Sequence, residues 1–206
     1  KLNIINQVAD LGVYIKIVGF SLSENITPQA IKGFKELAKK ADFVSREEVS
    51  QQRMLAFAPC KLGADCAFLM SPKIMLPSQK NEVFTWLEKS GFTVGLCLRT
   101  EDFLGNTESD IKRLEGFTKG LLSALKTRDA KLLLIPHHPK DIVMLKEVAV
   151  LLDRLDFTNY FLISKLPSAI EIKAYAEYCD HVITSRMHVA IATLGMKNAV
   201  TCLPYA

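Results

Sequence analysis

A short turn near the end of the chain combines side chains that can bind and move charge. Residues Ser185 to His188 read Ser-Arg-Met-His, after a β-branched run (181–184) that predicts a strand and before an apolar run (189–194) that predicts a buried helix ending at Gly195. The N–H groups of a first helical turn lack partners within the helix and carry the positive end of its dipole. A guanidinium and an imidazole beside them predict a site for an anion, most simply a phosphate or a carboxylate.

Polar and charged side chains also follow other apolar strands of the sequence, at the point where each predicted strand ends. They are Arg99, His137, His138, Ser164 and Lys165. Because the carboxyl ends of parallel strands share one edge of a sheet, we expect these residues to converge with Ser185, Arg186 and His188 in one cationic pocket. Arg99 and Arg186 should then lie close enough for one small anion to bridge them.

A metal site is the alternative interpretation of His137, His138 and Asp141. Adjacent residues at a strand end point in opposite directions, so the two imidazoles cannot readily share one ion. One imidazole should be packed and the other should face the pocket, and His138 is the better candidate because Pro139 begins the next helix. The sequence also lacks a glycine-rich phosphate loop, a G-x-S-x-G elbow and an H-E-x-x-H motif. We therefore predict no bound metal.

The composition is that of an ordinary soluble globular protein. The chain has 206 residues, of which 49% are hydrophobic and 23% are charged. The net charge is +4, and Lys and Arg are scattered, without the basic block of a nucleic-acid-binding protein. No apolar stretch approaches the ~20 residues that span a bilayer, and no signal peptide opens the sequence. We expect a cytoplasmic protein that binds no nucleic acid and has no transmembrane segment.

The cysteines favour a reducing environment. The five are Cys60, Cys66, Cys97, Cys179 and Cys202. Their number is odd, they lie mostly in apolar surroundings, and no C-x-x-C spacing occurs, so we expect reduced thiols in the core. A disulfide or metal site at Cys60 and Cys66 is the less favoured interpretation, because no second pair or histidine lies nearby.

Strand and helix patterns alternate along the whole chain. In the first part they predict helices over residues 1–10, 28–40 and 46–57, and strands over 13–20 and 42–45. After a proline-containing polar stretch, Ser71 to Lys80, they predict a helical or irregular segment over 82–89, helices over 109–126, 140–155, 168–178 and 189–194, and strands over 92–98, 131–135, 160–164, 181–184 and 198–203. Strands alternating with helices in this way indicate parallel sheets with helices on both faces. We predict an α/β protein with two sheets.

Two charged residues of the first part have both a functional and a structural interpretation. Arg46 follows a predicted strand, where open α/β sheets bind ligands, but a salt bridge explains it at least as well. Asp65 lies among apolar residues, and a helix cap or a hydrogen-bond anchor is its favoured role.

An ordered set of short segments resembles the polysaccharide pyruvyltransferase family. The strongest resemblance is in Asp180 to Tyr205, which reads DHVITSRMHVAIATLGMKNAVTCLPY. Upstream, the segments that look like the family's other landmarks, in the same order, are VGFS (18–21), ADFVSREEVS (41–50), GADCAF (63–68), VGLCLR (94–99) and LIPHHPKD (134–141). Each segment alone is weak, but the ordered set covers nearly the whole chain.

The resemblance implies a fold of two Rossmann-like lobes, similar to the GT-B type of glycosyltransferase architecture. Residues 1–71 are then expected to form the later part of an N-terminal α/β lobe, and residues 72–206 a C-terminal α/β lobe with the donor site. In the family, strands and helices precede the segment like VGFS, and a lysine and terminal helices follow the residue like Tyr205. The resemblance thus implies that the first lobe is incomplete and that the C-terminal end is missing.

The resemblance also implies a reaction. Enzymes of this family move the three-carbon unit of phosphoenolpyruvate onto a sugar of a surface polysaccharide or exopolysaccharide precursor as a ketal, without a cofactor. His188 is the implied general acid and base, and Arg186 and Arg99 are the implied ligands of the donor's charged groups, with His138 and Ser185 in the substrate-binding set. The implied partners are phosphoenolpyruvate and a glycan or lipid-linked acceptor. A lipid-linked acceptor would bring the protein to a membrane surface as a peripheral protein.

Two other functions stay open at this point. A GT-B glycosyltransferase that uses a nucleotide sugar could bind a diphosphate at the same helix N-terminus, and affinity for a nucleobase would separate it from a pyruvyltransferase. The other function is a non-catalytic module that binds anions or supports an assembly.

Overall fold

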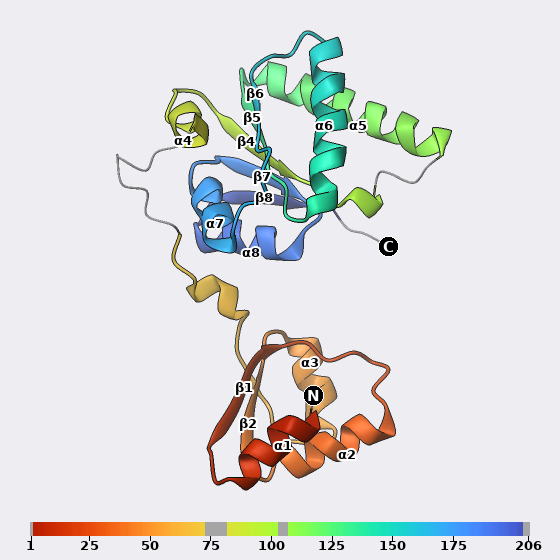
Figure 1. The fold of residues 1–206 in the computed structure, drawn as a ribbon, viewed down its shortest axis with the longest axis vertical. Helices are drawn as coiled ribbons and strands as arrows, with labels where there is room; N and C mark the ends of the chain where they lie inside the picture. The colour runs from red at the N-terminus through yellow and green to blue at the C-terminus, as the bar shows by residue number, and fades with distance from the viewer. Residues whose placement is uncertain (1, 73–81, 103–106, 204–206) are drawn as a thin grey trace. The chain divides into compact units, whose positions relative to one another are not determined.

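The computed structural model describes residues 2–72, 82–102 and 107–203, and the chain divides into two compact units, Lys1–Phe68 and Leu69–Ala206. Each unit is built on its own parallel sheet, as predicted (Figure 1). Most of the predicted linker, Ser71 to Lys80, lies outside the described residues.

The first unit alternates helices and short parallel strands. Its elements are α1 (Leu2–Asp10), β1 (Ile15–Phe20), α2 (Pro28–Leu37), β2 (Ala41–Ser45), α3 (Glu48–Leu55) and β3 (Lys61–Leu62), followed by a 3₁₀ turn (Cys66–Leu69). Within the described residues the sheet order is β1-β2-β3. Thr27 caps α2 with its side chain, and Pro28 occupies the first turn, where its missing N–H is harmless. The core of the unit includes Leu37, Phe43 and Met54.

Arg46 and Asp65 have structural roles in the first unit. Helix α3 begins at Glu48, later than predicted, because the side chain of Glu47 accepts the N–H of Ser50 and caps the helix. Arg46 stays outside the helix, and its Nη1 lies 2.9 Å from Asp65 Oδ2. The other oxygen of Asp65 accepts the N–H of Ala67 at 2.9 Å. The salt-bridge interpretation of Arg46 and the anchor interpretation of Asp65 are therefore confirmed.

The second unit is a doubly wound α/β layer structure. Its elements are α4 (Glu82–Leu87), β4 (Thr93–Cys97), a 3₁₀ turn (Thr100–Asp102), α5 (Glu108–Thr127), β5 (Lys131–Leu134), α6 (Pro139–Arg154), β6 (Tyr160–Leu162), α7 (Ala169–Glu177), β7 (His181–Thr184), α8 (Met187–Gly195) and β8 (Ala199–Cys202). Among the described residues the strand order is β6-β5-β4-β7-β8, all parallel. Helices α5 and α6 pack on one face of this sheet, and α4, α7 and α8 on the other (Figure 1).

The central strands are buried on both faces, which explains their nearly continuous apolar sequences. All residues of β4 and β5 are buried. The exception in sequence is Lys131, whose Nζ donates to the backbone carbonyls of Trp86 and Leu87, at the end of α4, and of Lys89. The ammonium thus completes the hydrogen bonds of the helix C-terminus. Burial lowers the pKa of Lys131 below its ordinary value, because desolvation disfavours its charge.

Helix α8 differs from its prediction at both ends. It starts at Met187, because Arg186 already has the extended backbone of an N-cap residue. His188 therefore lies in the first helical turn and not in the preceding loop. At the other end Gly195 is still helical, and the left-handed residue that follows is Lys197, with φ 63°. The predicted glycine cap is wrong in this detail.

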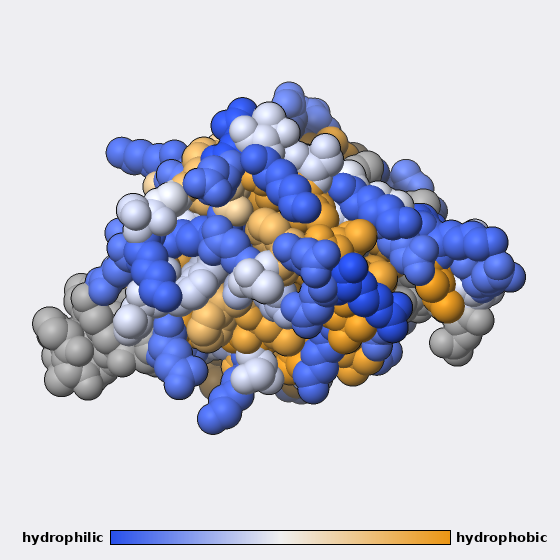
Figure 2. All heavy atoms as spheres, turned by 90° about the horizontal axis from the view of Figure 1, so that it is seen from above, coloured by the Kyte–Doolittle hydropathy of each residue, from blue (hydrophilic) through white to orange (hydrophobic). Residues whose placement is uncertain are grey.

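The surface is mixed. Figure 2 shows hydrophilic side chains over most of one face, with smaller apolar areas between them. Exposed apolar residues of α5 and α6 include Ile111, Val143 and Val150, and such scattered residues are normal on protein surfaces. In the described part of the chain, no helix has the length and apolar composition needed to cross a bilayer.

The cysteines are all free, but not all of them lie in the core. Cys60, Cys97 and Cys179 are buried, as predicted, whereas Cys66 and Cys202 are exposed. Burial raises the pKa of both Cys97 and Cys179 to about 12, because the thiolate is poorly solvated there.

Candidate anion-binding site

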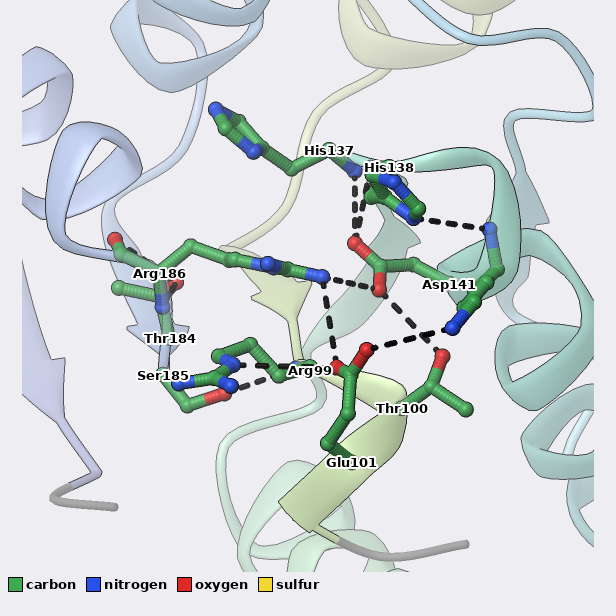
Figure 3. Close-up of polar contacts among 10 residues, drawn as sticks. Arg99, Thr100, Glu101, His137, His138, Asp141, Thr184, Ser185 and Arg186 are labelled. Carbon is green, nitrogen blue, oxygen red and sulfur yellow. Dashed lines mark hydrogen bonds and ion pairs between the residues drawn. The ribbon is translucent and has the colours of Figure 1, made fainter. Parts of the chain in front are cut away.

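The carboxyl ends of β4, β5 and β7 meet at one cavity of the second unit, shown in part in Figure 3. The cavity has a volume of about 190 Å³ and is lined by Arg99, His137, Ser185, Arg186, Met187 and His188. Five of the residues predicted to converge are thus together, namely Arg99, His137, Ser185, Arg186 and His188. Their convergence follows from parallel strands, whose carboxyl ends lie on one edge.

Ser185 joins the ends of β4 and β7. Cys97 pairs with Thr184 in the sheet, and directly beyond this pair the N–H of Ser185 donates to the Cys97 carbonyl at 3.1 Å. The N–H of Arg99 in turn donates to Ser185 Oγ at 2.8 Å. These bonds fix the backbone from which both Arg99 and Arg186 extend. Ser185 is buried, and its hydroxyl proton remains a possible donor to a ligand in the cavity.

Arg186 is held by a buried carboxylate that the sequence interpretation had considered only as a metal ligand. Its Nη2 lies 2.5 Å from Asp141 Oδ1, and the Asp141 side chain is 0% exposed. The other oxygen, Oδ2, accepts the N–H groups of His137 and His138 at 3.2 and 2.9 Å. In the described part of the chain, the Nε of Arg186 is buried without a hydrogen-bond partner, so a ligand could accept from it.

A sequence signal for Asp141 exists. Pro139 at the first helical position and an acidic residue two positions later are typical of a helix start, and Asp141 completes a capping box at the N-terminus of α6. This signal predicts the cap. It does not predict that the same carboxylate also reaches an arginine from β7, which only the packing of the two strand ends decides.

Glu101 is a second carboxylate beside the arginines. Its Oε2 lies 3.8 Å from Arg99 Nε and 4.0 Å from Arg186 Nη2, and its Oε1 lies 4.0 Å from Lys140 Nζ. The two arginines therefore approach the same oxygen atom, so they lie as close together as expected. That one small anion binds to both stays a prediction. The pKa of the Glu101 carboxyl is lowered first by a hydrogen bond from its own backbone and then by the charges of Arg186, Arg99 and Lys140.

Of the two histidines after β5, His138 was predicted to face the cavity, and this prediction is wrong. His138 is exposed and forms the N-cap of α6, where its Nδ1 accepts the N–H of Lys140 at 3.3 Å. His137 lines the cavity instead, and its ring points away from Asp141 (Figure 3). The reason is the capping geometry, since the N-cap side chain must fold back over the helix start. The pKa of His137 is lowered, mainly by burial and also by the charge of Arg186.

His188 and Met187 occupy the first turn of α8. His188 is exposed and lines the cavity, and its imidazole has no hydrogen-bond partner among the described residues. Met187 is 42% exposed and lines the cavity as well. It is exposed because it starts the helix at the sheet edge. Arg186, the N-cap residue, makes no side-chain bond to the helix, so α8 presents its first N–H groups beside the cavity.

Ser164 and Lys165 do not join this cavity. They line a separate, larger cavity of about 500 Å³ at the end of β6, together with residues of α4 and α7 such as Glu82 and Tyr175. Strand β6 is at the sheet edge, and β5 separates it from β4, so the loop after β6 lies too far along the edge. The cationic pocket therefore contains fewer of the predicted residues than expected.

No metal-binding arrangement is found in residues 2–72, 82–102 and 107–203, where no three His, Cys, Asp or Glu side chains group around a possible ion position. Asp141 is engaged with Arg186 and two backbone N–H groups. The absence of a metal requirement stays a prediction.

Solved structures with a similar fold are nucleotide-sugar enzymes. A putative UDP-N-acetylglucosamine 2-epimerase from Listeria monocytogenes has a TM-score of 0.58 and 15% identity, and the match covers 98% of this chain and 60% of that one. UDP-GlcNAc 2-epimerase from Methanocaldococcus jannaschii has a TM-score of 0.56 and 16% identity, with 97% and 64% covered. At such identities the likeness shows the fold alone, which is a mixed α/β fold with Rossmann-like lobes of the GT-B type. The chain spans about 60% of the length of the Listeria protein.

The sequence comparisons agree with the landmarks found along the chain. A search of curated proteins found no match. The family model described as polysaccharide pyruvyl transferase matches residues 9–206, which include both sheets and every residue of the cavity. The chain therefore belongs to the polysaccharide pyruvyl transferase family.

Proposed function

We propose that the protein transfers the pyruvyl unit of phosphoenolpyruvate to a sugar of a polysaccharide precursor and forms a ketal. The observation that carries this proposal is the placement of Arg99 and Arg186 around one oxygen atom, at 3.8 and 4.0 Å, beside the N-terminus of α8. Phosphoenolpyruvate has a carboxylate and a phosphate, and arginine can donate two parallel bonds to either group.

The two arginines differ in what they can offer. Arg186 is fixed by Asp141 through one nitrogen, which leaves its Nε to donate to the donor's phosphate or carboxylate. Arg99 extends from the end of β4, with its backbone anchored to Ser185. A departing phosphate would be stabilised by the guanidinium groups and by the first N–H groups of α8.

The chemistry requires one proton on carbon and the release of two protons from hydroxyls. A proton adds to the methylene carbon of the donor, C2 gains positive character, and one sugar hydroxyl attacks C2 and loses its proton. The C2–O bond to phosphate then breaks, and a second hydroxyl of the same sugar attacks C2 to close the ketal. One of the two hydroxyl protons replaces the proton taken from the protein, and the other leaves with phosphate or solvent.

His188 is the proposed proton donor and acceptor. Its imidazole is exposed at the cavity, and imidazole exchanges protons near neutral pH. His137 lines the same cavity with a lowered pKa, so it favours the neutral form and would act as a hydrogen-bonding group or a base. Ser185 and His137 complete the proposed donor site, and His137 takes the place that the sequence interpretation gave to His138.

The proposed acceptor is a glycan or a lipid-linked sugar. The family name implies a polysaccharide product, and a lipid-linked precursor would place the reaction at the cytoplasmic face of a membrane, with the protein bound peripherally. The cavity after β6 lies on the same sheet edge as the donor site and offers space for part of an acceptor.

A phosphate-release assay tests the proposal. The purified protein is given phosphoenolpyruvate with a panel of lipid-linked and nucleotide-linked sugars, and the product is checked by mass spectrometry for the added pyruvyl ketal. We expect phosphate release with at least one sugar, and its loss in Arg186→Ala but not in the exposed control Glu108→Gln on α5. Tight binding of a nucleotide sugar, with sugar transfer and no ketal formation, would instead identify a glycosyltransferase.

A further inference from the structure

Glu101 lies beside the candidate site, within reach of three cationic side chains. Three cations from different elements approach its carboxylate: Arg99 after β4, Arg186 after β7 and Lys140 in the first turn of α6. All three N···O distances are between 3.8 and 4.0 Å, close enough for attraction but too long for direct hydrogen bonds. Figure 3 shows the Glu101 carboxylate joined to Arg186 by a dashed line.

The two carboxylates of the site differ in how firmly they are held. Asp141 is 0% exposed, and it accepts bonds from Arg186 and two backbone N–H groups, so removing it from its cations would leave buried groups unsatisfied. The side chain of Glu101 is 47% exposed and lies in a short 3₁₀ turn, so rotation of its side chain can bring the carboxylate into water. Asp141 is a permanent part of the site, whereas Glu101 is exchangeable.

The charges support the same distinction. Arg99, Arg186 and Lys140 carry three positive charges, and Asp141 and Glu101 together carry two negative charges. With Glu101 in place the local sum is one positive charge. With Glu101 turned away it is two, which attracts an anionic ligand more strongly.

We propose that Glu101 is an internal counter-ion that takes the place of the ligand's anionic group in the ligand-free protein and competes with it for Arg99, Arg186 and Lys140. This inference rests on the proposed function for the identity of the ligand, and it adds two residues to the site. Glu101 sets the affinity for anions, and Lys140 becomes a third cation for the bound ligand. The acidic side chain keeps the cationic groups paired until a stronger anion arrives.

Removing the competitor should strengthen anion binding. Exposed ion pairs are individually weak, so three such pairs should amount to about a 3- to 10-fold change in the dissociation constant of an anion. Glu101→Gln removes the charge and keeps the shape. Glu101→Asp keeps the charge but moves it back by about one methylene. Its affinity for the anion should therefore lie between those of the unsubstituted chain and Glu101→Gln.

The experiment measures inorganic phosphate binding to the purified chain by isothermal titration calorimetry at constant pH and ionic strength. The proteins are the unsubstituted chain, Glu101→Gln, Glu101→Asp, and the control Glu108→Gln, which removes an exposed carboxylate that pairs with Lys112 on α5. Fluorescence of Trp86, the one tryptophan of the sequence, verifies that each variant is folded. We expect Glu101→Gln to bind phosphate about 3- to 10-fold more tightly and Glu108→Gln to be unchanged.

The other outcomes separate this inference from the proposed function. An unchanged or weaker phosphate affinity of Glu101→Gln would overturn the competition, since Glu101 would then be a surface ion pair or a support of the arginines, and the donor site would stand. If neither the unsubstituted chain nor Glu101→Gln binds phosphate, the anion site itself is wrong, and both the proposed function and this inference fall.

Discussion

At the scale of single residues, the site is built on pairs of identical groups in different surroundings. Asp141 and Glu101 are both carboxylates beside Arg186, but only Asp141 is buried and bound by backbone N–H groups. His137 and His138 are adjacent, but only His137 lines the cavity. Residue type alone therefore does not assign a role, because burial and hydrogen bonds decide which group is fixed and which is available to a ligand.

Arg186 and His188 should fail differently when they are replaced. Arg186→Lys keeps the charge but loses the fork that contacts Asp141 and, as proposed, the donor, so it should chiefly weaken donor binding. His188→Gln keeps a hydrogen-bonding group but cannot exchange a proton, and kcat should fall by about 10²- to 10⁴-fold while phosphoenolpyruvate still binds. Steady-state kinetics and donor titration on both variants check this. Near-normal turnover of His188→Gln would leave His188 without a role in proton transfer.

Asp141→Asn should destabilise the second unit. The substitution leaves Arg186, which is 18% exposed, without its carboxylate and weakens the acceptor of two backbone N–H groups. We expect the free energy of unfolding to fall by about 2 to 3 kcal/mol. Urea unfolding followed by Trp86 fluorescence measures it, and the exposed Glu147→Gln on α6 should stay within about 0.5 kcal/mol of the unsubstituted chain. Equal effects of the two variants would contradict the role given to Asp141.

His137 should contribute to the pH dependence of stability. Its folded-state pKa is lowered by burial and by Arg186, so the unfolded chain takes up a proton first as the pH falls below about 6.5. The free energy of unfolding should therefore decrease from pH 7 toward pH 5, by at most about 1.4 kcal/mol per pH unit from this group. Urea unfolding across this range should show a shallower decrease for His137→Asn. Parallel pH profiles of the two proteins would be evidence against the assignment.

At the scale of elements, the central strand β4 positions Arg99 and is packed tightly on both faces. Gly95 lies in the middle of this strand, where a Cβ atom would come within 3.0 Å of Cys179 Sγ, 3.2 Å of Val182 Cγ2 and 3.3 Å of Ile135 Cδ1. The absence of a side chain at Gly95 leaves room for the side chains of Cys179, Val182 and Ile135. The position of the arginines thus depends on a residue that has no side chain.

Gly95→Ala should overpack the sheet. We expect a loss of about 1 to 3 kcal/mol in the free energy of unfolding, because the three neighbouring side chains must move. Gly120→Ala on α5 is the matched control, since a Cβ atom there has no neighbour within 4 Å, and it should stabilise the helix by about 0.5 to 1 kcal/mol. Thermal or urea unfolding of both variants measures the change in the free energy of unfolding. A stabilising effect of Gly95→Ala would show that the space beside the strand can hold a methyl group.

At the scale of the whole molecule, the chain consists of two α/β units, and the candidate site described here lies within the second. The charges that would bind the donor are arginine and lysine side chains and a helix N-terminus, all supplied by the protein itself. Because these groups could neutralise a bound phosphate, we predict that the site needs no divalent cation.

Catalysis should therefore not depend on a divalent metal. Treatment of the active protein with a chelator is expected to leave the rate of phosphate release from phosphoenolpyruvate unchanged. The measurement compares the rate before and after chelation and again after addition of magnesium, manganese or zinc. A loss that one of these ions restores would refute the prediction.

The order of elements and most of the site residues could be predicted from the sequence, because both depend on local patterns. Alternation of apolar strands and amphipathic helices predicts two parallel sheets, and the rule that parallel strands end on one edge brings Arg99, Ser185, Arg186 and His188 together. The family landmarks are also local and ordered along the chain, and the family match over residues 9–206 confirms what they indicated.

The tertiary structure alone decided how these residues are paired. The contact of Asp141 with Arg186 joins residues 45 positions apart, and it exists because α6 and β7 place a helix cap and a strand end side by side. The same packing brings Glu101 between the cations and places His137, not His138, in the cavity. It also places Ser164 and Lys165 in another cavity. Sequence periodicity shows where strands and helices lie, and their alternation indicates parallel strands. The side-chain geometry at a strand end depends on neighbours that are distant in sequence.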